Sequence, residues 1–163
     1  MTRYRPPAAA KSPYITPQGM RALLTEQKAL WLKRREVVAA LSAAAAEGDR
    51  SENAEYIYRK KELREIDRRI RYLQKRLPDL NVVSQKPASS GQVFFGATVT
   101  LEDENQAVLS YRIVGPDEFD HAEHYISVDS PLARSLLKRE LGDEVVVEVP
   151  NGRMVYCIVD IAY

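Results

Sequence analysis

The sequence predicts an α+β protein with an N-terminal antiparallel coiled-coil hairpin, residues 15–83, followed by an antiparallel β-sheet domain with one helix, residues 92–163. The chain changes character near Val83, because the patterns before it have the period of long helices and those after it the period of strands and turns. Residues 84–91 are polar and rich in Pro, Gly and Ser, which is typical of a linker.

The composition narrows the functional classes. The 163 residues allow one large domain or two small ones, and a net charge of +1 argues against tight independent binding of duplex DNA. Cys157 is the single cysteine, so the chain forms no internal disulfide. Neither a secretory signal nor a run of about 20 apolar residues is visible, which predicts a cytoplasmic protein that does not cross a membrane.

The first helix is expected to follow a flexible tail, residues 1–14. Thr16 is a natural N-cap and Pro17 a natural first helical residue. The apolar residues that come next are paired and spaced one heptad apart, as in a coiled coil. These pairs are Leu23/Leu24, Leu30/Trp31, Val37/Val38 and Ala44/Ala45.

The second helix shows a stricter repeat, in which apolar residues alternate steps of three and four and form a coiled-coil seam. Its members are Leu63, Ile66, Ile70, Leu73, Leu77 and Leu80. Pro78 lies inside this seam, so we expect the regular helix to end or kink near Leu77. Two such helices joined by a short turn bury both stripes only when they run antiparallel, which places residues 47–49 at the free tip of a rod about 45 Å long.

The second half predicts five strands and one helix. Strands are expected near residues 97–101, 107–114, 125–128, 144–149 and 154–161, with a hairpin turn at Asn151-Gly152. A helix from Pro131 to Leu141 should follow Asp129-Ser130 and stop at Gly142. A sheet with one helix packed on it is the economical arrangement of these elements.

Acidic residues gather at the expected tip, in the run from Gly48 to Tyr56. One interpretation is helix capping, with Asp49 as the N-cap of the second helix and Glu52 completing a capping box. The other is metal binding together with a partner. Mg²⁺ commonly takes only one or two protein carboxylates, so a pair displayed on a stalk could complete a site that another molecule has half-built.

Basic residues recur at helical spacing along the second helix below the tip. We name this set the basic stripe; its members are Lys60, Lys61, Arg64, Arg68, Arg71 and Lys75. The stripe is either a solvated face laced with ion pairs to interspersed acids, or a surface for a nucleic-acid backbone. It is too narrow for tight independent binding and better suits an RNA that a partner already holds. Three tyrosines could stack on bases: Tyr56, Tyr58 and Tyr72.

Two runs of residues resemble the signatures of the Gre family of bacterial transcript cleavage factors, GreA and GreB. They are the run from Gly48 to Tyr56 and the run from Ser130 to Lys138, the latter followed by Gly142-Asp143. Their order and separation fit as well, and the resemblance covers nearly the whole chain after Thr16. Arg50 and the runs 64–69 and 93–96 favour the GreB type, whereas Glu47 stands where the family usually has an apolar residue.

The resemblance implies an FKBP-like fold for the C-terminal domain. It also implies that this domain docks on the rim of the secondary channel of bacterial RNA polymerase, through a surface that includes Asp129, Ser130 and Pro131. The coiled coil would enter the channel. A monomeric factor with weak or no independent DNA binding is expected.

The resemblance further implies how the tip acts. Asp49 and Glu52 would help the aspartates of the polymerase to hold a second Mg²⁺ and to orient the attacking water, so that the polymerase cuts its own backtracked RNA. The Mg²⁺ would be shared with the polymerase, and the factor would not be an enzyme by itself. The basic stripe would guide the extruded 3′ end of the nascent RNA. The residues expected to support the tip or to contact RNA there are Ser51, Asn53, Glu55 and Tyr56.

Two alternative functions stay open. A Gre-like inhibitor would occupy the channel without promoting cleavage, and loss of the acidic residues of the tip would favour it, but both are present. A prolyl isomerase of the FKBP type would need an aromatic-rich pocket, and the C-terminal half has few aromatic residues. His121 and His124 lie in a polar loop without a nearby cysteine or further histidine, so we expect surface residues there and no metal site.

Overall fold

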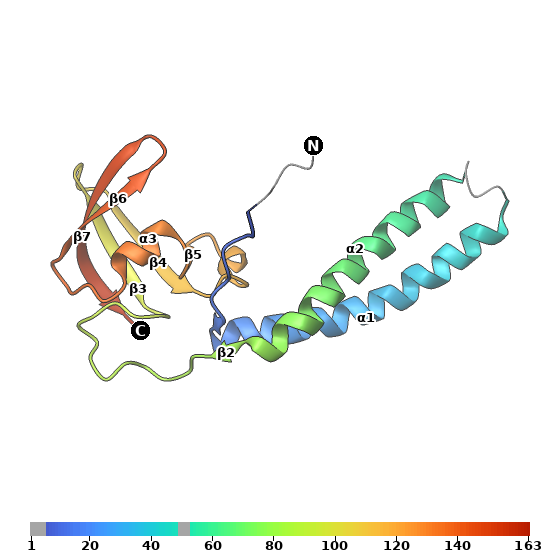
Figure 1. Ribbon diagram of the computed structural model, residues 1–163, viewed down its shortest axis with the longest axis horizontal. Helices are drawn as coiled ribbons and strands as arrows, with labels where there is room; N and C mark the ends of the chain where they lie inside the picture. The colour runs from blue at the N-terminus through green and yellow to red at the C-terminus, as the bar shows by residue number, and fades with distance from the viewer. Residues whose placement is uncertain (1–5, 49–52) are drawn as a thin grey trace. The chain divides into compact units, whose positions relative to one another are not determined.

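The computed structural model describes residues 6–48 and 53–163 and divides into two compact units. The hairpin unit comprises Met20–Leu80. The sheet unit combines the residues up to Gly19 with Asn81–Tyr163, so the start of the chain belongs to the same unit as its end. Figure 1 shows both units as ribbons.

Two long helices form the hairpin unit (Figure 1). α1 spans Pro17–Ala46, with its first residues in the sheet unit, and α2 spans Ala54–Arg76. Glu26 near the start of α1 pairs with Arg69 near the end of α2, and Lys33 pairs with Glu62. Partners thus move back along α2 as they advance along α1, which confirms the expected antiparallel pair.

The seam predicted on α2 packs against α1. Every one of its six residues is buried or half-buried, and Ile66 and Ile70 form a core cluster with Val37 of α1. In the heptad pairs of α1, the first member is the more buried one. Leu23 is completely buried while Leu24 is exposed, and Trp31 is exposed in the same way.

α2 ends where Pro78 predicts. The last regular residue is Arg76, and Leu77–Asp79 form a 3₁₀ turn, η1, in which Leu80 donates its N–H to the Leu77 carbonyl oxygen at 3.3 Å. Proline lacks the N–H that would continue the α-helical ladder, so the chain tightens into this turn and then leaves the hairpin.

The sheet unit carries a curled five-stranded sheet in the order β5-β4-β3-β7-β6 (Figure 1). The strands are β3 (Thr98–Asp103), β4 (Val108–Val114), β5 (Tyr125–Ser127), β6 (Glu144–Val149) and β7 (Gly152–Ala162). The predicted fold class is confirmed, with one refinement. Strand β5 runs parallel to β4, because the chain crosses back through a loop that contains the 3₁₀ turn η2 (Phe119–His121) before β5 begins.

One face of the sheet is covered by α3 (Pro131–Leu136). Ala133 and Leu136 of this helix are completely buried and join the inward-facing residues of the strands in a single core. Alternate residues of β3 and β6 face this core, as the period of a half-buried strand requires. The buried core residues of the strands and their approaches include Val93, Ala97, Val99, Leu101, Ile113, Val128, Val145 and Ile158.

The predicted end of α3 at Leu141 is wrong, because the helix stops at Leu136. Lys138 adopts a left-handed conformation, with φ of 67°, and donates its N–H to the Val93 carbonyl oxygen at 2.7 Å. Val93 in turn donates its N–H to the carbonyl oxygen of Arg139 at 2.9 Å. Pairing with the strand-like segment at Val93 therefore replaces the last turn of the expected helix.

The start of α1 is bonded to a buried carboxylate of the sheet unit. Glu118 is almost completely buried and accepts three hydrogen bonds: from the Thr16 N–H at 2.7 Å, from the Thr16 hydroxyl, and from the Gly115 N–H at 3.1 Å. Thr16 is the predicted N-cap, since its Oγ1 accepts the N–H of Gly19 at 3.0 Å. Glu118 thus plays, from far along the chain, the part that a glutamate at the third helical position plays in a capping box.

A second carboxylate holds the segment before α1. Asp129 accepts hydrogen bonds from both the N–H (2.9 Å) and the hydroxyl of Ser12. Tyr14–Ile15 form a short strand, β1, that pairs in parallel with β2, Asn81–Val82. Residues 12–16, which the sequence assigned to the tail and the start of the hairpin, therefore lie on the sheet unit.

Gly19→Ala should destabilise the protein, although the same change inside a helix normally stabilises it by up to about 1 kcal/mol. A Cβ at Gly19 would lie 2.6 Å from the Cδ of Glu118, whose side chain is held by three hydrogen bonds. We expect a loss of about 1–3 kcal/mol in the free energy of unfolding, as overpacking costs. Urea denaturation followed by circular dichroism measures it.

Gly91→Ala is the matched control, because the nearest atom to its new Cβ would be the Ser89 Oγ at an ordinary 3.6 Å. Its stability should change by less than about 0.5 kcal/mol. A Gly19→Ala variant as stable as the parent chain would show that Glu118 can move aside and does not fix the start of α1.

Candidate functional site

The turn that carries the predicted acidic tip is described only up to its two shoulders. Gly48 has a φ of 142°, a conformation that suits glycine, and α2 begins at Ala54. Asp49, Ser51 and Glu52 lie outside the described residues, so their roles stay predictions from the sequence.

Asn53 closes the hairpin at the tip. Its Oδ1 accepts the Tyr56 N–H at 3.1 Å, so Asn53 is the N-cap of α2. Its Nδ2 donates to the Ala44 carbonyl oxygen at the end of α1, at 2.7 Å. The capping interpretation of Asp49 is therefore wrong, because the cap lies four residues later. The side chain of Asn53 bridges the ends of both helices, which is one way in which it could support the tip, as expected from the sequence.

The next two tip residues interact with cations of α2. Glu55 is exposed and accepts a hydrogen bond from the Arg59 Nε at 2.8 Å. This bond, with the charges of Glu55 and Glu62, raises the pKa of the Arg59 guanidinium. Tyr56 is half-buried, and the Lys60 Nζ lies 5.8 Å from the centre of its ring. Glu55 and Tyr56 are therefore both held by contacts with side chains one turn further along α2.

No metal-binding cluster forms from the described residues alone. Within residues 6–48 and 53–163, no three His, Cys, Asp or Glu side chains are placed to hold an ion together. His121 and His124 are exposed, and the ring of His124 packs edge-on against Tyr125.

The basic stripe is fully exposed. Its six residues occupy about 100° of the surface of α2 and extend over about 22 Å. This arc lies opposite the seam formed by Ile66, Ile70 and Leu73. Within the described part of the chain, none of the six takes part in an ion pair, so their charges face solvent without a carboxylate partner.

Two of the three acids interspersed with the stripe pair with other cations, whereas the third, Glu65, is exposed and forms no ion pair among the described residues. Glu62 pairs with Arg59 and with Lys33 of α1, and Asp67 with Arg34 of α1. Arg69 forms two hydrogen bonds with Glu26, at 2.6 and 3.0 Å. The pairs with Lys33, Arg34 and Glu26 link the two helices beside the seam. The structure therefore favours an open cationic surface over a face laced with ion pairs.

Sequence reasoning missed an exposed apolar residue near the tip. Ile57 is 53% exposed and lies on the face of the basic stripe. Extending the seam of α2 backwards from Leu63 in strictly alternating steps of four and three gives positions 59 and 56 and not position 57. The phase of the repeat could therefore have flagged it as an outward-facing residue.

The expected docking residues lie at the start of α3, and two of them are engaged within the chain. The carboxylate of Asp129 holds Ser12, and the Oγ of Ser130 accepts the Ala133 N–H at 3.2 Å as the N-cap of α3. Pro131 occupies the first helical position and is exposed. Its neighbour one turn on, Arg134, is exposed as well.

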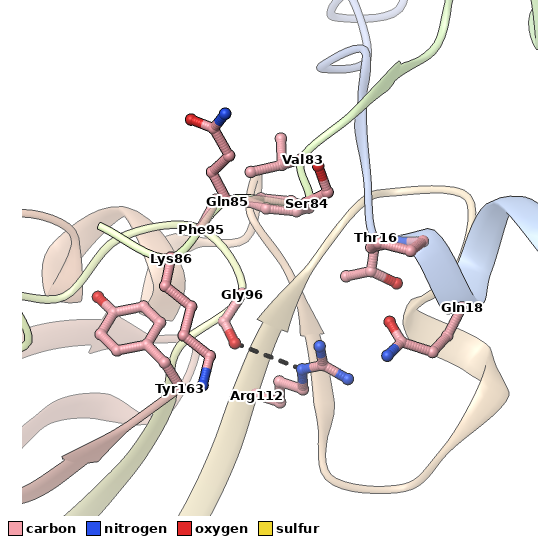
Figure 2. Close-up of a pocket in the computed structure, with 11 residues that line it drawn as sticks. Thr16, Gln18, Val83, Ser84, Gln85, Lys86, Phe95, Gly96, Arg112 and Tyr163 are labelled. Atoms are coloured by element: carbon pink, nitrogen blue, oxygen red, sulfur yellow. Dashed lines mark hydrogen bonds between the residues drawn. The ribbon is translucent and has the colours of Figure 1, made fainter. Parts of the chain in front are cut away.

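The sheet unit also contains a cavity of about 230 Å³ that the sequence did not reveal (Figure 2). Its charged side chains are those of Lys86 and Arg112, and no Asp or Glu is found among the described residues that line it. The Nε of Arg112 lies 3.4 Å from the Gly96 carbonyl oxygen, and its guanidinium lies 5.7 Å from the ring centre of Tyr125. The chemistry of this lining suits an anion and not a metal cation.

None of the helices in the described ranges combines the length and the apolar character that crossing a bilayer requires.

Comparison with known proteins finds relatives over the whole chain. The family described as transcription elongation factor, N-terminal, matches residues 13–82, and the family described as transcription elongation factor, GreA/GreB, C-term, matches residues 88–163. The chain is 55% identical over 164 residues to transcription elongation factor GreB of Pseudomonas aeruginosa, an alignment that covers 100% of this chain and 98% of that protein.

Two further relatives come from other species. Transcription elongation factor GreB of Haemophilus influenzae is 58% identical over 144 residues, which cover 88% of this chain and 91% of that protein. A solved structure of the prokaryotic transcription elongation factor GreA/GreB from Nitrosomonas europaea is 25% identical, with a TM-score of 0.43, and the match covers 58% of this chain and 79% of that one.

Asn53→Ala should loosen the start of α2. Loss of an N-cap costs about 1 kcal/mol, so the amide of Tyr56 should exchange with solvent about five-fold faster. Hydrogen exchange measured by NMR tests this. Asn53→Asp is the control, because it keeps the oxygen that caps Tyr56 and removes only the donor to Ala44. Equal protection of Tyr56 in the parent and the alanine variant would contradict the role of Asn53 as the cap.

Proposed function

The chain belongs to the GreA/GreB family of transcription elongation factors, and on this premise we propose that it stimulates the RNA polymerase to cleave its own backtracked transcript. The hairpin unit enters the secondary channel, and the tip reaches the active centre. The observation that supports this most directly is the basic stripe, which is exposed, free of ion pairs within the described residues, and directed along α2 towards the acidic tip.

Asp49 and Glu52 carry the chemistry of the tip in this proposal. Two carboxylates cannot satisfy a Mg²⁺ ion alone but can complete a coordination shell that the polymerase supplies in part. A Mg²⁺ held in this way lowers the pKa of its bound water and stabilises negative charge on phosphate. The factor thus activates the polymerase and is not an enzyme by itself.

The shoulders of the tip would keep these carboxylates in place. Asn53 fixes the start of α2 against the end of α1. Glu55 is paired with Arg59 and so is less available as a ligand than a free carboxylate would be. We therefore assign Asn53, Glu55 and Tyr56 to positioning, and leave the metal to Asp49 and Glu52.

The basic stripe binds the extruded 3′ segment of the RNA. An arc of six cations over about 22 Å offers contacts to several successive phosphates. Its opposite side is the seam of the hairpin, so the stripe can face the RNA without loss of helix pairing. Because the net charge of the chain is only +1, the chain as a whole attracts nucleic acid weakly, and binding depends on local clusters of cations such as this stripe.

The sheet unit docks on the polymerase through the start of α3. Pro131 and Arg134 are exposed and form the contact surface. Asp129 and Ser130 support it from within, because their side chains hold Ser12 and cap α3. A monomer suffices for this arrangement, since one sheet unit provides the docking surface and one hairpin unit enters the channel.

Asp49→Asn should reduce stimulated cleavage by more than about a hundred-fold, because the neutral amide weakens the hold on a Mg²⁺ ion whose contribution amounts to several kcal/mol. The measurement is the release of short 3′ fragments from stalled, backtracked complexes with 3′-labelled RNA. Binding to polymerase, measured by competition, should stay within about two-fold of the parent chain, because docking resides elsewhere.

Glu47→Gln is the matched control for the loss of one negative charge at the tip, and its cleavage should change little. Full activity of Asp49→Asn would refute the metal role of Asp49. Absence of cleavage with the parent chain, together with intact binding to polymerase, would identify an inhibitor that occupies the channel.

Reversing three members of the stripe, Arg64, Arg68 and Arg71, to Glu should selectively impair cleavage in deeply backtracked complexes. Only deeply backtracked complexes extrude enough RNA to reach the stripe. Three charge reversals remove the attraction between the stripe and the phosphates of that RNA. The ratio of cleavage rates in deep and shallow complexes should fall by about ten-fold or more. No ion pair between described residues is broken by these changes.

The matched control reverses Arg21, Lys28 and Arg35, three exposed cations of α1, to Glu. It makes the same change in net charge on the same hairpin and should leave the ratio of deep to shallow cleavage near that of the parent. Equal losses in deep and shallow complexes with the α2 variant would mean that the stripe does not guide RNA.

A further inference from the structure

Tyr72 occupies a distinctive place on the hairpin unit. Its half-buried side chain lines two hollows of the surface, one on either side along α2. The first, of about 280 Å³, is completed by Glu65, Arg68 and Arg69. The second, of about 210 Å³, is completed by Lys75, Arg76 and Asp79. A molecule seated in either hollow would touch the aromatic ring.

Each hollow joins the ring to the basic stripe. Arg68 lines the first hollow and Lys75 the second, and both are exposed members of the stripe. On a helix of about 100° per residue, Tyr72 lies about 40° from Arg68 and about 60° from Lys75. Each hollow is lined by two cations and one carboxylate. In the first hollow Arg69 is already paired with Glu26 of α1, so Arg68 is the cation that can attract a phosphate there, as Lys75 can in the second. An apolar wall thus stands beside groups that attract phosphate.

The ring is also held in position. The guanidinium of Arg69 lies over it, 5.3 Å from its centre, at a distance typical of a cation–π contact. Arg69 is itself fixed by two hydrogen bonds to Glu26 of α1. Because its support is anchored on the other helix, Tyr72 loses little freedom when a flat ligand packs against it.

We infer that Tyr72 stacks on a nucleobase of the RNA that the basic stripe holds, so that the stripe selects single-stranded RNA with accessible bases. The inference rests on the proposed function of the stripe and adds a contact to the bases. Every base has a face that can stack on tyrosine, so this contact is independent of sequence. Bases inside a duplex are stacked on one another and cannot reach the ring.

The test measures binding of the full chain to two fluorescein-labelled probes by anisotropy at low ionic strength. One probe is a single-stranded oligoadenylate, and the other is an abasic oligonucleotide of the same length and charge. The parent chain should bind the oligoadenylate more tightly. Tyr72→Leu should lower that affinity by about ten-fold and leave the affinity for the abasic probe within about two-fold. Tyr72→Phe should keep the preference.

The matched control is Tyr58→Leu. Tyr58 is an exposed tyrosine of the same helix and also lies beneath a guanidinium, that of Arg59 at 5.5 Å, but it lines neither hollow. Its loss should leave the preference for bases unchanged. Circular dichroism of each variant verifies that the helices are intact.

The outcomes separate this inference from the proposed function. If the parent chain binds neither probe, stacking by Tyr72 on free single-stranded RNA is overturned, and the proposed cleavage function is still decided by the assay on backtracked complexes. If it binds both probes equally, and reversal of Arg64, Arg68 and Arg71 weakens both, the stripe stands and stacking by Tyr72 is overturned. Equal weakening of both probes by Tyr72→Leu would also overturn it, because a stacking residue affects only the base-bearing probe.

Discussion

The carboxylate of Glu118 is the interaction on which the organisation of the chain depends. A charge buried this deeply is costly unless it is fully hydrogen-bonded, and here it accepts two bonds from the distant Thr16 and one from the nearby Gly115. Two of those donors belong to Thr16, the residue that starts α1. The same carboxylate explains two small residues, because a side chain at Gly19 or at Gly115 would collide with Glu118 or with the backbone of Tyr14. A helix of 30 residues thus begins on the sheet unit.

The hairpin unit divides its charges into two populations. Acids beside the seam pair with cations on both helices, as Asp67 does with Arg34 and Glu26 with Arg69. Exposed pairs of this kind contribute little to stability, typically up to about 1 kcal/mol each. Their more important consequence is that they occupy Glu62 and Asp67, two of the three acids interspersed with the stripe. The basic stripe therefore keeps a strong local positive charge although the whole chain is almost neutral.

The C-terminal signature motif has a structural explanation alongside its proposed role in docking. Ser130 caps α3, Pro131 opens it, and Ala133 and Leu136 bury its inner face in the core of the sheet unit. Asp129, just before the motif, holds the segment that leads to α1. Much of the motif therefore specifies a short helix that is fixed by its cap and by its buried face. The exposed side of that helix is the part that a partner could contact.

The sequence by itself determined the elements whose signals are local. Heptad spacing, the cap at Thr16 and the break at Pro78 predicted both long helices, the start of α1 and the end of α2, and turn residues predicted the five strands. The cap of α2 was expected at Asp49 and lies at Asn53. Periodicity and capping depend only on near neighbours, which is why they can be read from one chain. The candidate residues of the stripe were likewise predicted, since helical phase alone places them on one face.

Tertiary structure decided everything that depends on partners far away in the chain. Pairing with Val93 shortened α3, and β5 lies parallel to β4. Which carboxylates neutralise which cations, and hence whether the stripe is open, followed from the contacts of α2 with α1. The bonds of Glu118 to the start of α1 join residues 102 positions apart. No local pattern encodes such a contact, because the chain must fold before the two groups meet.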